Sequence, residues 1–94
     1  AIVRARDASH AVALANESRF GLGGAIWTRD VERGKALARG SASGAVFVNG
    51  MTASDPRLPF GGVKHSGYGR ELSYVGIREF TNVQTVWVGP VVNA

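Results

Sequence analysis

The sequence contains no cysteine, and this absence excludes two kinds of structure at once. Without thiols the chain can form neither a disulfide framework nor a thiolate metal site. Its two histidines are too few to hold a metal ion by themselves. The sequence therefore predicts a chain without a metal centre.

Long apolar runs are also missing. No stretch approaches the roughly 18 consecutive apolar residues that a membrane-spanning helix needs. No charged segment followed by an apolar run suggests a signal peptide. We therefore expect no membrane partner, and the composition suits a cytoplasmic protein.

Acidic residues are scarcer than basic ones, seven against eleven, which gives a formal net charge of +4. A basic protein can bind nucleic acid through a patch or stripe of lysine and arginine. Here the basic residues are scattered along the chain with acids between them, and they form no run that could follow a phosphate backbone. We expect no nucleic-acid partner.

Apolar residues, by contrast, are plentiful. They make up 45% of the 94 residues, whereas charged residues make up 19%. A chain of this length forms one small domain at most, and it is more apolar than such a domain needs when it stands alone. A piece of a larger core would have this composition, and it would expose apolar surface.

Helical spacing appears first at residues 8–16, where the apolar residues fall on one face of a helix: Ala8, Ala11, Val12 and Ala15. Asp7 precedes them and predicts an N-cap, because its carboxylate can accept hydrogen bonds from the first free amides. Residues 19–22 are predicted to form a turn, with Gly21 in the left-handed position that often follows a helix.

A second helix is predicted between two apolar strands, at residues 24–28 and 44–49. Asp30 opens this helix, which runs to about Arg39 and ends at Gly40. Its inward-facing residues are Val31, Leu37 and Ala38. The run at residues 44–49 is nearly continuous rather than alternating, which is typical of a parallel strand buried on both faces. The alternation of strands and helices predicts an α/β fold with a parallel sheet and crossover helices.

The last regular elements are a short helix at residues 71–80 and a strand that begins at Val83 and ends at Val88. The helix is predicted to bury three residues: Leu72, Val75 and Phe80. The strand is rich in β-branched residues and has no helix after it, so it has a free edge, and free edges invite pairing with another chain.

Four glycines and a proline fall within residues 59–71, PFGGVKHSGYGRE, and predict a folded loop of fixed shape. This loop resembles the PFGGxKxSGxGRE signature of aldehyde dehydrogenases and matches it at every fixed position. The resemblance extends over essentially the whole chain, and residues 47–56 are similar to the succinate-semialdehyde dehydrogenase branch.

Family subunits are several times longer than this chain, so the resemblance implies that it is a C-terminal piece of such an enzyme. Residues 1–80 would belong to the catalytic domain. Residues 81–94 would form an oligomerisation strand and a tail, through which the subunit joins a homo-oligomer.

Aldehyde dehydrogenases use a cysteine thiolate, a nicotinamide that accepts hydride and a glutamate that activates water. This chain has no thiol, and its four glutamates do not match the position of the family's base. We therefore expect no catalytic residue and no activity of the chain alone. The parent enzyme would bind NAD or NADP mainly elsewhere, because the Gly67-Tyr68-Gly69 stretch lacks the third glycine of a dinucleotide fingerprint.

The resemblance implies a substrate-binding role for two residues. Ser54 matches the serine that binds the far carboxylate of succinate semialdehyde, and Phe60 matches an aromatic at the floor of the pocket. On the residues alone, Ser54 is equally a turn residue beside Asp55-Pro56, and Phe60 is equally a core residue. Arg57 is a tempting carboxylate partner, but the resemblance assigns it no role.

The charged residues of the signature loop, Lys64, Arg70 and Glu71, are interpreted as structural. Many relatives carry an acid where this chain has Asn82, so an ion pair from that position to Arg70 cannot form here. A second interpretation of the whole chain remains open, in which it is a free-standing α/β module that binds a protein partner without catalysis.

Overall fold

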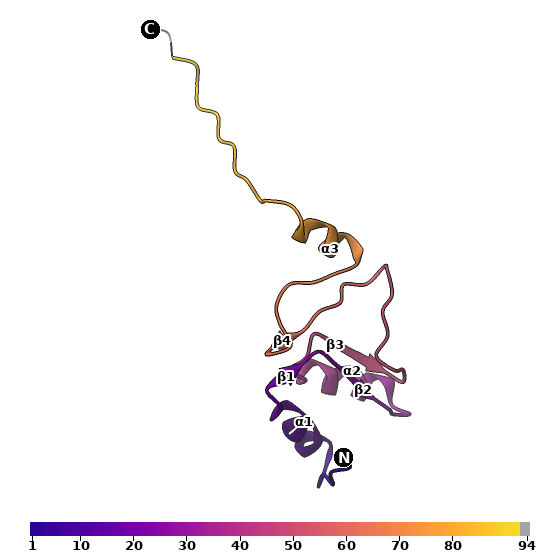
Figure 1. The fold of residues 1–94 in the computed structure, drawn as a ribbon. Helices are drawn as coiled ribbons and strands as arrows, with labels where there is room; N and C mark the ends of the chain where they lie inside the picture. The colour runs from indigo at the N-terminus through magenta and orange to yellow at the C-terminus, as the bar shows by residue number, and fades with distance from the viewer. Residues whose placement is uncertain (93–94) are drawn as a thin grey trace.

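A computed structural model describes residues 1–92 as an α/β body from which the C-terminal residues extend (Figure 1). The first helix, α1 (Ala8–Asn16), begins and ends as predicted. The Asp7 carboxylate accepts a hydrogen bond of 2.7 Å from the His10 backbone amide and caps the helix. At the other end, the Asn16 side chain accepts from the Ala42 amide and donates to the Gly40 carbonyl, each over 2.8 Å.

The centre of the body is a parallel pair of strands, β2 (Gly23–Ile26) and β3 (Ala45–Val48), joined through α2 (Val31–Arg39). This confirms the predicted strand, helix and strand. Asp30 caps α2 by accepting a hydrogen bond of 3.0 Å from the Arg33 amide. Gly34 is buried where α2 crosses β3, and an added Cβ there would lie 2.9 Å from a Val48 methyl group. A residue without a side chain therefore lets α2 pack closely on the sheet.

Burial around this sheet is shallower than the sequence predicts. All four residues of β3 are only half-buried, and Val31, predicted to face inward, is 47% exposed. Among the described residues, no large apolar side chain is fully buried. The reason is that two strands and the helices on them leave much of each face uncovered, whereas the apolar run of β3 is suited to burial on both sides.

The predicted turn at residues 19–22 is wrong. Phe20 and Gly21 instead form a short strand, β1 (Phe20–Gly21), antiparallel to β4 (Val63–Lys64) inside the glycine-rich loop. The Ser66 hydroxyl accepts a hydrogen bond of 2.9 Å from the Gly21 amide and supports the same contact. The glycine-rich loop is thus attached to the segment that links α1 with the parallel sheet.

The third helix is shorter than predicted. It is α3 (Ser73–Glu79), because Glu71 pairs with Phe60 in an isolated antiparallel bridge and Leu72 has a φ of 66°. That positive φ lies outside the right-handed helical region, so the helix cannot include residue 72. The predicted burial of Phe80 is also wrong, since this side chain is 94% exposed.

Residues 81–92 form an extended segment that leaves the body after α3 (Figure 1). The predicted strand at residues 83–88 is extended but unpaired, and Val83 and Trp87 are 96% and 82% exposed. A strand needs a hydrogen-bonding neighbour, and none of the described residues offers one. The segment gives the molecule a longest dimension of 75 Å.

Within residues 1–92 the longest helices have nine residues, and none has the length and apolarity to cross a membrane.

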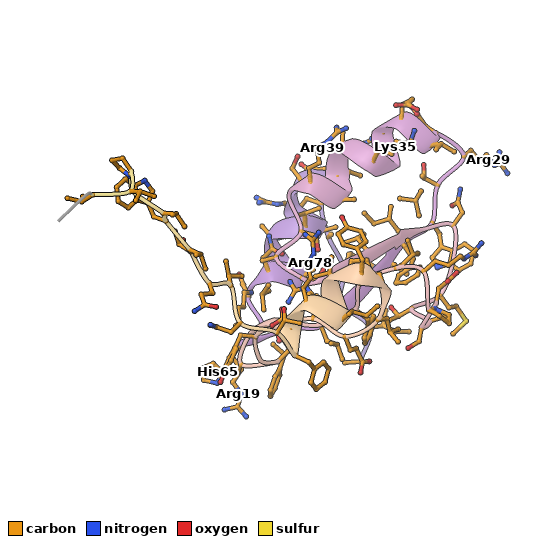
Figure 2. All side chains as sticks on the ribbon, turned by 90° about the horizontal axis from the view of Figure 1, so that it is seen from above. Arg19, Arg29, Lys35, Arg39, His65 and Arg78 are labelled. Atoms are coloured by element: carbon orange, nitrogen blue, oxygen red, sulfur yellow. The ribbon has the colours of Figure 1, made fainter. Side chains whose placement is uncertain are left out.

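The basic side chains labelled in Figure 2 come from different parts of the chain. Arg29, Lys35 and Arg39 lie along α2 and the turn before it, Arg78 lies on α3, and Arg19 lies near His65 at the opposite end. The expectation that no nucleic acid binds remains a prediction.

Candidate functional site

The glycines of the 59–71 loop allow backbone segments to approach each other directly. A Cβ added to Gly44, directly before β3, would overlap the carbonyl oxygen of Gly61. A Cβ on Gly61 would overlap the Gly69 carbonyl oxygen, and one on Gly62 would lie 2.5 Å from the Ser66 side chain. The predicted fixed loop is therefore present, and glycine is needed at these positions because no side chain fits.

Two other glycines of the loop are needed for their backbone conformation rather than for close packing. Gly67 and Gly69 have φ values of 114° and 82°, which residues with side chains rarely adopt. Between them Tyr68 is completely exposed. The loop thus reverses direction at this point and returns along itself toward α3.

Lys64 fastens the loop to the end of α1. Its ammonium group donates hydrogen bonds to the Asn16 and Ser18 carbonyls, over 2.8 and 2.9 Å. A cation suits this place, because the last carbonyls of a helix lack partners within the helix and carry partial negative charge. The contacts favour the structural interpretation of Lys64.

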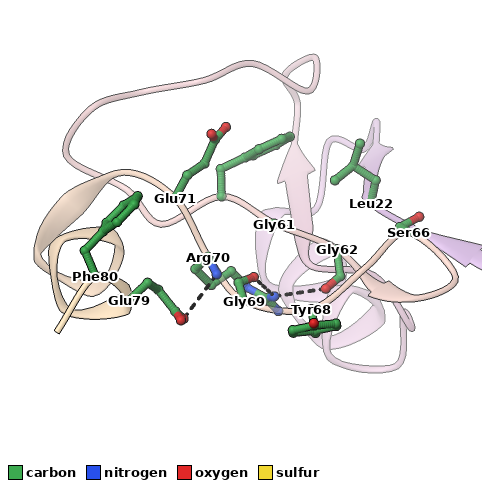
Figure 3. A pocket seen from close by; sticks show the side chains of 11 residues that line it. Leu22, Gly61, Gly62, Ser66, Tyr68, Gly69, Arg70, Glu71, Glu79 and Phe80 are labelled. Carbon is green, nitrogen blue, oxygen red and sulfur yellow. Dashed lines mark hydrogen bonds between the residues drawn. The ribbon is translucent and has the colours of Figure 1, made fainter. Parts of the chain in front are cut away.

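Arg70 holds the two sides of the loop together (Figure 3). Its Nη1 donates to the Gly62 carbonyl over 2.9 Å and to the Gly69 carbonyl over 2.6 Å. Its backbone amide donates to the Glu79 carboxylate over 3.2 Å, which links the loop to α3. Within residues 1–92 Asn82 makes no hydrogen bond to Arg70, so the loop is held by its own carbonyls.

Beside Arg70 lies an open hollow between the loop and α3 (Figure 3). Phe60, Glu79 and Phe80 line it together with the loop glycines. Phe60 is half-buried and also borders a second hollow against β3. Its position between the two hollows fits both a core residue and a pocket-lining aromatic, and its substrate role remains a prediction.

Ser54 lies on the exposed stretch between β3 and the signature loop. The stretch is anchored at its start by Asn49, whose side-chain oxygen accepts a hydrogen bond of 2.8 Å from the Thr28 amide. In the part of the chain that the structure describes, the Ser54 hydroxyl makes no hydrogen bond, so it is available to a ligand.

Asp55, rather than Ser54, forms the turn that follows. Its carboxylate accepts from the Arg57 amide over 2.9 Å, and its carbonyl accepts from the Leu58 amide over 3.0 Å. Aspartate commonly forms turns in this way, by binding the backbone two residues later. The sequence placed a turn here but did not identify the residue that makes it.

The Arg57 guanidinium is bound to the same carboxylate. Nε and Nη2 donate to the two oxygens of Asp55 over 3.0 and 2.7 Å. These hydrogen bonds lower the pKa of the Asp55 carboxyl below its ordinary value and raise the pKa of Arg57. Sequence reasoning missed this pair, although an aspartate two residues before an arginine is a local signal that could have indicated it.

Groups that could perform chemistry are not gathered at this site. Glu71 and Glu79 serve the loop through a backbone bridge and a hydrogen bond, while Glu32 pairs with Lys35 on α2 over 2.9 Å. The described residues contain no cluster of side chains that could hold a metal ion. The Gly67-Tyr68-Gly69 stretch follows β4, a two-residue strand that pairs antiparallel with β1, so it does not open the parallel strand–helix–strand unit of a dinucleotide fingerprint. The expectation that this chain binds no cofactor remains a prediction.

Comparison with known proteins gives one family. The sequence profile described as "Aldehyde dehydrogenase family" matches residues 1–86. A Synechocystis protein named "Probable succinate-semialdehyde dehydrogenase", NADP(+), is 59% identical over 78 residues, which are 83% of this chain and 17% of that protein. The Mycobacterium tuberculosis "Succinate-semialdehyde dehydrogenase", NADP(+), 1 is 54% identical over 87 residues, 93% of this chain and 19% of that protein.

A solved structure shows the same fold. The succinic semialdehyde dehydrogenase of Streptococcus pyogenes, in complex with NADP+ as the cofactor, is 43% identical to this chain and has a TM-score of 0.83. The match covers 89% of this chain and 18% of that one. The predicted α/β fold class is confirmed, and the chain spans less than a fifth of the length of the relatives that it matches.

Proposed function

Because the chain belongs to the aldehyde dehydrogenase family, we propose that it is the C-terminal part of an NADP-dependent succinate-semialdehyde dehydrogenase. The observation that supports this most directly is an identity of more than half, over most of the chain, to proteins named for that activity. Their names favour NADP over NAD, an alternative that the sequence left open. The parent enzyme would oxidise succinate semialdehyde to the carboxylate and reduce the nicotinamide.

Within that enzyme, this chain supplies part of the wall of the substrate pocket. The exposed Ser54 hydroxyl can donate a hydrogen bond to the far carboxylate of the substrate, and an acceptor-only group such as a carboxylate needs donors. Phe60 contributes an apolar surface to the same substrate pocket. A site that binds the substrate through such a donor discriminates against aldehydes that have no group to accept the bond.

The remainder of the parent supplies the reaction itself. This chain has no cysteine, and we expect the dinucleotide to be bound mainly by other parts of the parent. NADP, when bound by the parent, accepts the hydride. The chain's own contribution is to shape the pocket. Lys64 and Arg70 hold the signature loop in place, and the Ser73 amide at the start of α3 donates a hydrogen bond to the Pro56 carbonyl of the pocket stretch.

The extended segment is proposed to join subunits into a homo-oligomer. Residues 83–88 expose both their side chains and their backbone hydrogen-bonding groups, and pairing with a strand of another subunit would satisfy the latter. The division into a catalytic part, residues 1–80, and an oligomerisation part, residues 81–94, is part of this proposal, and a cytoplasmic location remains a prediction.

A hybrid subunit tests the proposal. The 87-residue segment of the M. tuberculosis enzyme that matches this chain is replaced by this chain's own residues, and NADPH formation is followed with succinate semialdehyde. We expect kcat/KM within about tenfold of the M. tuberculosis enzyme, because pocket wall and loop would be equivalent.

Butanal serves as the uncharged control substrate of the same carbon number. A hybrid that unfolds at the same temperature as the M. tuberculosis enzyme but oxidises butanal in preference to succinate semialdehyde would contradict the proposed substrate. A binding module without catalysis would give a folded hybrid that oxidises neither aldehyde.

A further inference from the structure

The Asp55–Arg57 pair directly follows Ser54 and organises the turn at residues 55–58. Three hydrogen bonds join the two residues, one from the Arg57 amide and two from its guanidinium, over 2.7 to 3.0 Å. Asp55 thus binds both the backbone and the side chain of Arg57. The only other ion pair in the described residues joins Lys35 to Glu32 on α2, so no second pair supports this stretch.

The turn is also attached to the start of α3. The Pro56 carbonyl accepts a hydrogen bond of 3.0 Å from the Ser73 amide, and the Leu58 amide donates to the Asp55 carbonyl over 3.0 Å. Residues 55–58 are therefore held from both sides. Ser54 has no such contact of its own in the described chain, so the direction of its hydroxyl depends on the turn that begins at the next residue.

The same contacts limit what Arg57 can do. The edge of its guanidinium that carries Nε and Nη2 can bind a carboxylate through two parallel hydrogen bonds, and Asp55 already occupies this edge. The side chain of Arg57 is 87% exposed, whereas that of Asp55 is 31% exposed. Asp55 is thus the inner member of the pair, and Arg57 covers it from the solvent side.

We propose that the Asp55–Arg57 pair positions Ser54 for the substrate's far carboxylate, and that Arg57 does not bind the substrate itself. Asp55 and Arg57 are then positioning residues that set selectivity for a carboxylate-bearing aldehyde. The inference rests on the proposed function, because it needs a substrate with a carboxylate. It goes beyond that function by explaining how a hydroxyl on an exposed stretch acquires a defined place.

Three single substitutions in the hybrid subunit test this: Asp55→Asn, Arg57→Ala and Ser54→Ala. The Asp55 and Arg57 variants are expected to raise KM for succinate semialdehyde by about three- to fivefold, the range open to an exposed pair. KM for butanal and kcat for both aldehydes should stay within about twofold, because only the interaction with the carboxylate is lost.

The double variants Ser54→Ala/Asp55→Asn and Ser54→Ala/Arg57→Ala provide the decisive comparison. If the pair acts through Ser54, adding either change to Ser54→Ala leaves KM for succinate semialdehyde where Ser54→Ala alone puts it. Lys35→Ala, which breaks the other exposed ion pair, is the matched control and should change neither KM.

Two results would overturn the inference. A fall in KM for succinate semialdehyde in Asp55→Asn, with a rise in Arg57→Ala, would identify Arg57 as a direct ligand released by loss of its partner. Equal changes for succinate semialdehyde and butanal would show that the pair only stabilises the fold. Failure of the proposed function is distinguishable, because it would already appear in the unsubstituted hybrid as a lack of selectivity.

Discussion

At the scale of single residues, the proposed substrate selectivity depends on one side chain, that of Ser54. Its hydroxyl is exposed, makes no hydrogen bond within the described residues, and lies next to a rigid turn. A hydrogen bond to a charged acceptor contributes about 1.5–3 kcal/mol, which corresponds to roughly a tenfold to a hundredfold change in affinity. Substitutions here should therefore affect charged and uncharged aldehydes differently.

In the hybrid subunit, Ser54→Phe is expected to raise KM for succinate semialdehyde by at least about tenfold, because the donor is lost and an apolar ring takes its place. KM for butanal should stay the same or fall. Steady-state kinetics with both aldehydes measures this. Ser54→Thr keeps the hydroxyl and serves as the control; an equal rise for both aldehydes in Ser54→Phe would exclude a role in carboxylate binding.

Predictions from sequence succeeded at the residue scale where the chemistry is local. Asp7 and Asp30 cap their helices as expected, because an N-cap depends on amides only three residues away. Asn16 was missed as a link between α1 and the turn after α2, since its partners lie more than twenty residues later in the chain. Likewise, only the structure shows that the Ser54 hydroxyl makes no hydrogen bond within the described residues.

At the scale of elements, the helices α1 and α2 and the strands β2 and β3 were predicted to within about two residues at each end. The short strands β1 and β4 were not predicted. Phe20 pairs with Lys64, a partner far along the chain, and two residues are too few to show any periodicity. The helix α3 was likewise predicted to within two residues, and its start differs because leucine gives no sequence signal for the positive φ of Leu72.

The close contact between Gly44 and the signature loop should contribute to the stability of the fold. Gly44→Ala would put a Cβ into the Gly61 carbonyl, so β3 and the loop must separate. In the hybrid subunit we expect a loss of about 1–3 kcal/mol in the free energy of unfolding, as for other overpacked sites. Denaturant unfolding measures the loss.

Gly24→Ala is the matched control on the neighbouring strand. There the nearest atom to an added Cβ, the Ser43 hydroxyl oxygen, lies 4.0 Å away, so stability should change by less than about 0.5 kcal/mol. If both substitutions cost the same, the close approach of Gly44 and Gly61 does not contribute to the stability of the folded enzyme.

The molecule as a whole is rich in apolar residues but buries few of them. The composition predicted exposed apolar surface, and the described residues indeed include no fully buried large apolar side chain. The radius of gyration is 19.5 Å, against about 12 Å for a compact chain of this length. Burial could not be predicted from the pattern of β3 alone, because it depends on which segments cover the sheet.

The extended segment, residues 81–92, leads to a prediction about the oligomeric state. Removing residues 83–94 from the hybrid subunit should reduce its oligomeric state, because the exposed strand can no longer pair. Sedimentation or light scattering of the purified protein measures the mass. Removal of residues 91–94 alone keeps residues 83–88 and should leave the mass of the assembly unchanged; an unaltered assembly after the longer deletion would contradict the proposed pairing.

The length of the segment also limits how far away a neighbouring subunit's strand can lie. Twelve residues, 81 to 92, reach at most about 40–43 Å when fully extended, and the segment follows closely after α3. A neighbouring strand that pairs with it must lie inside that radius. Two copies that exchange these segments hold each other on short tethers, so once the first strand has paired, the second searches a small volume and pairs at a high effective concentration.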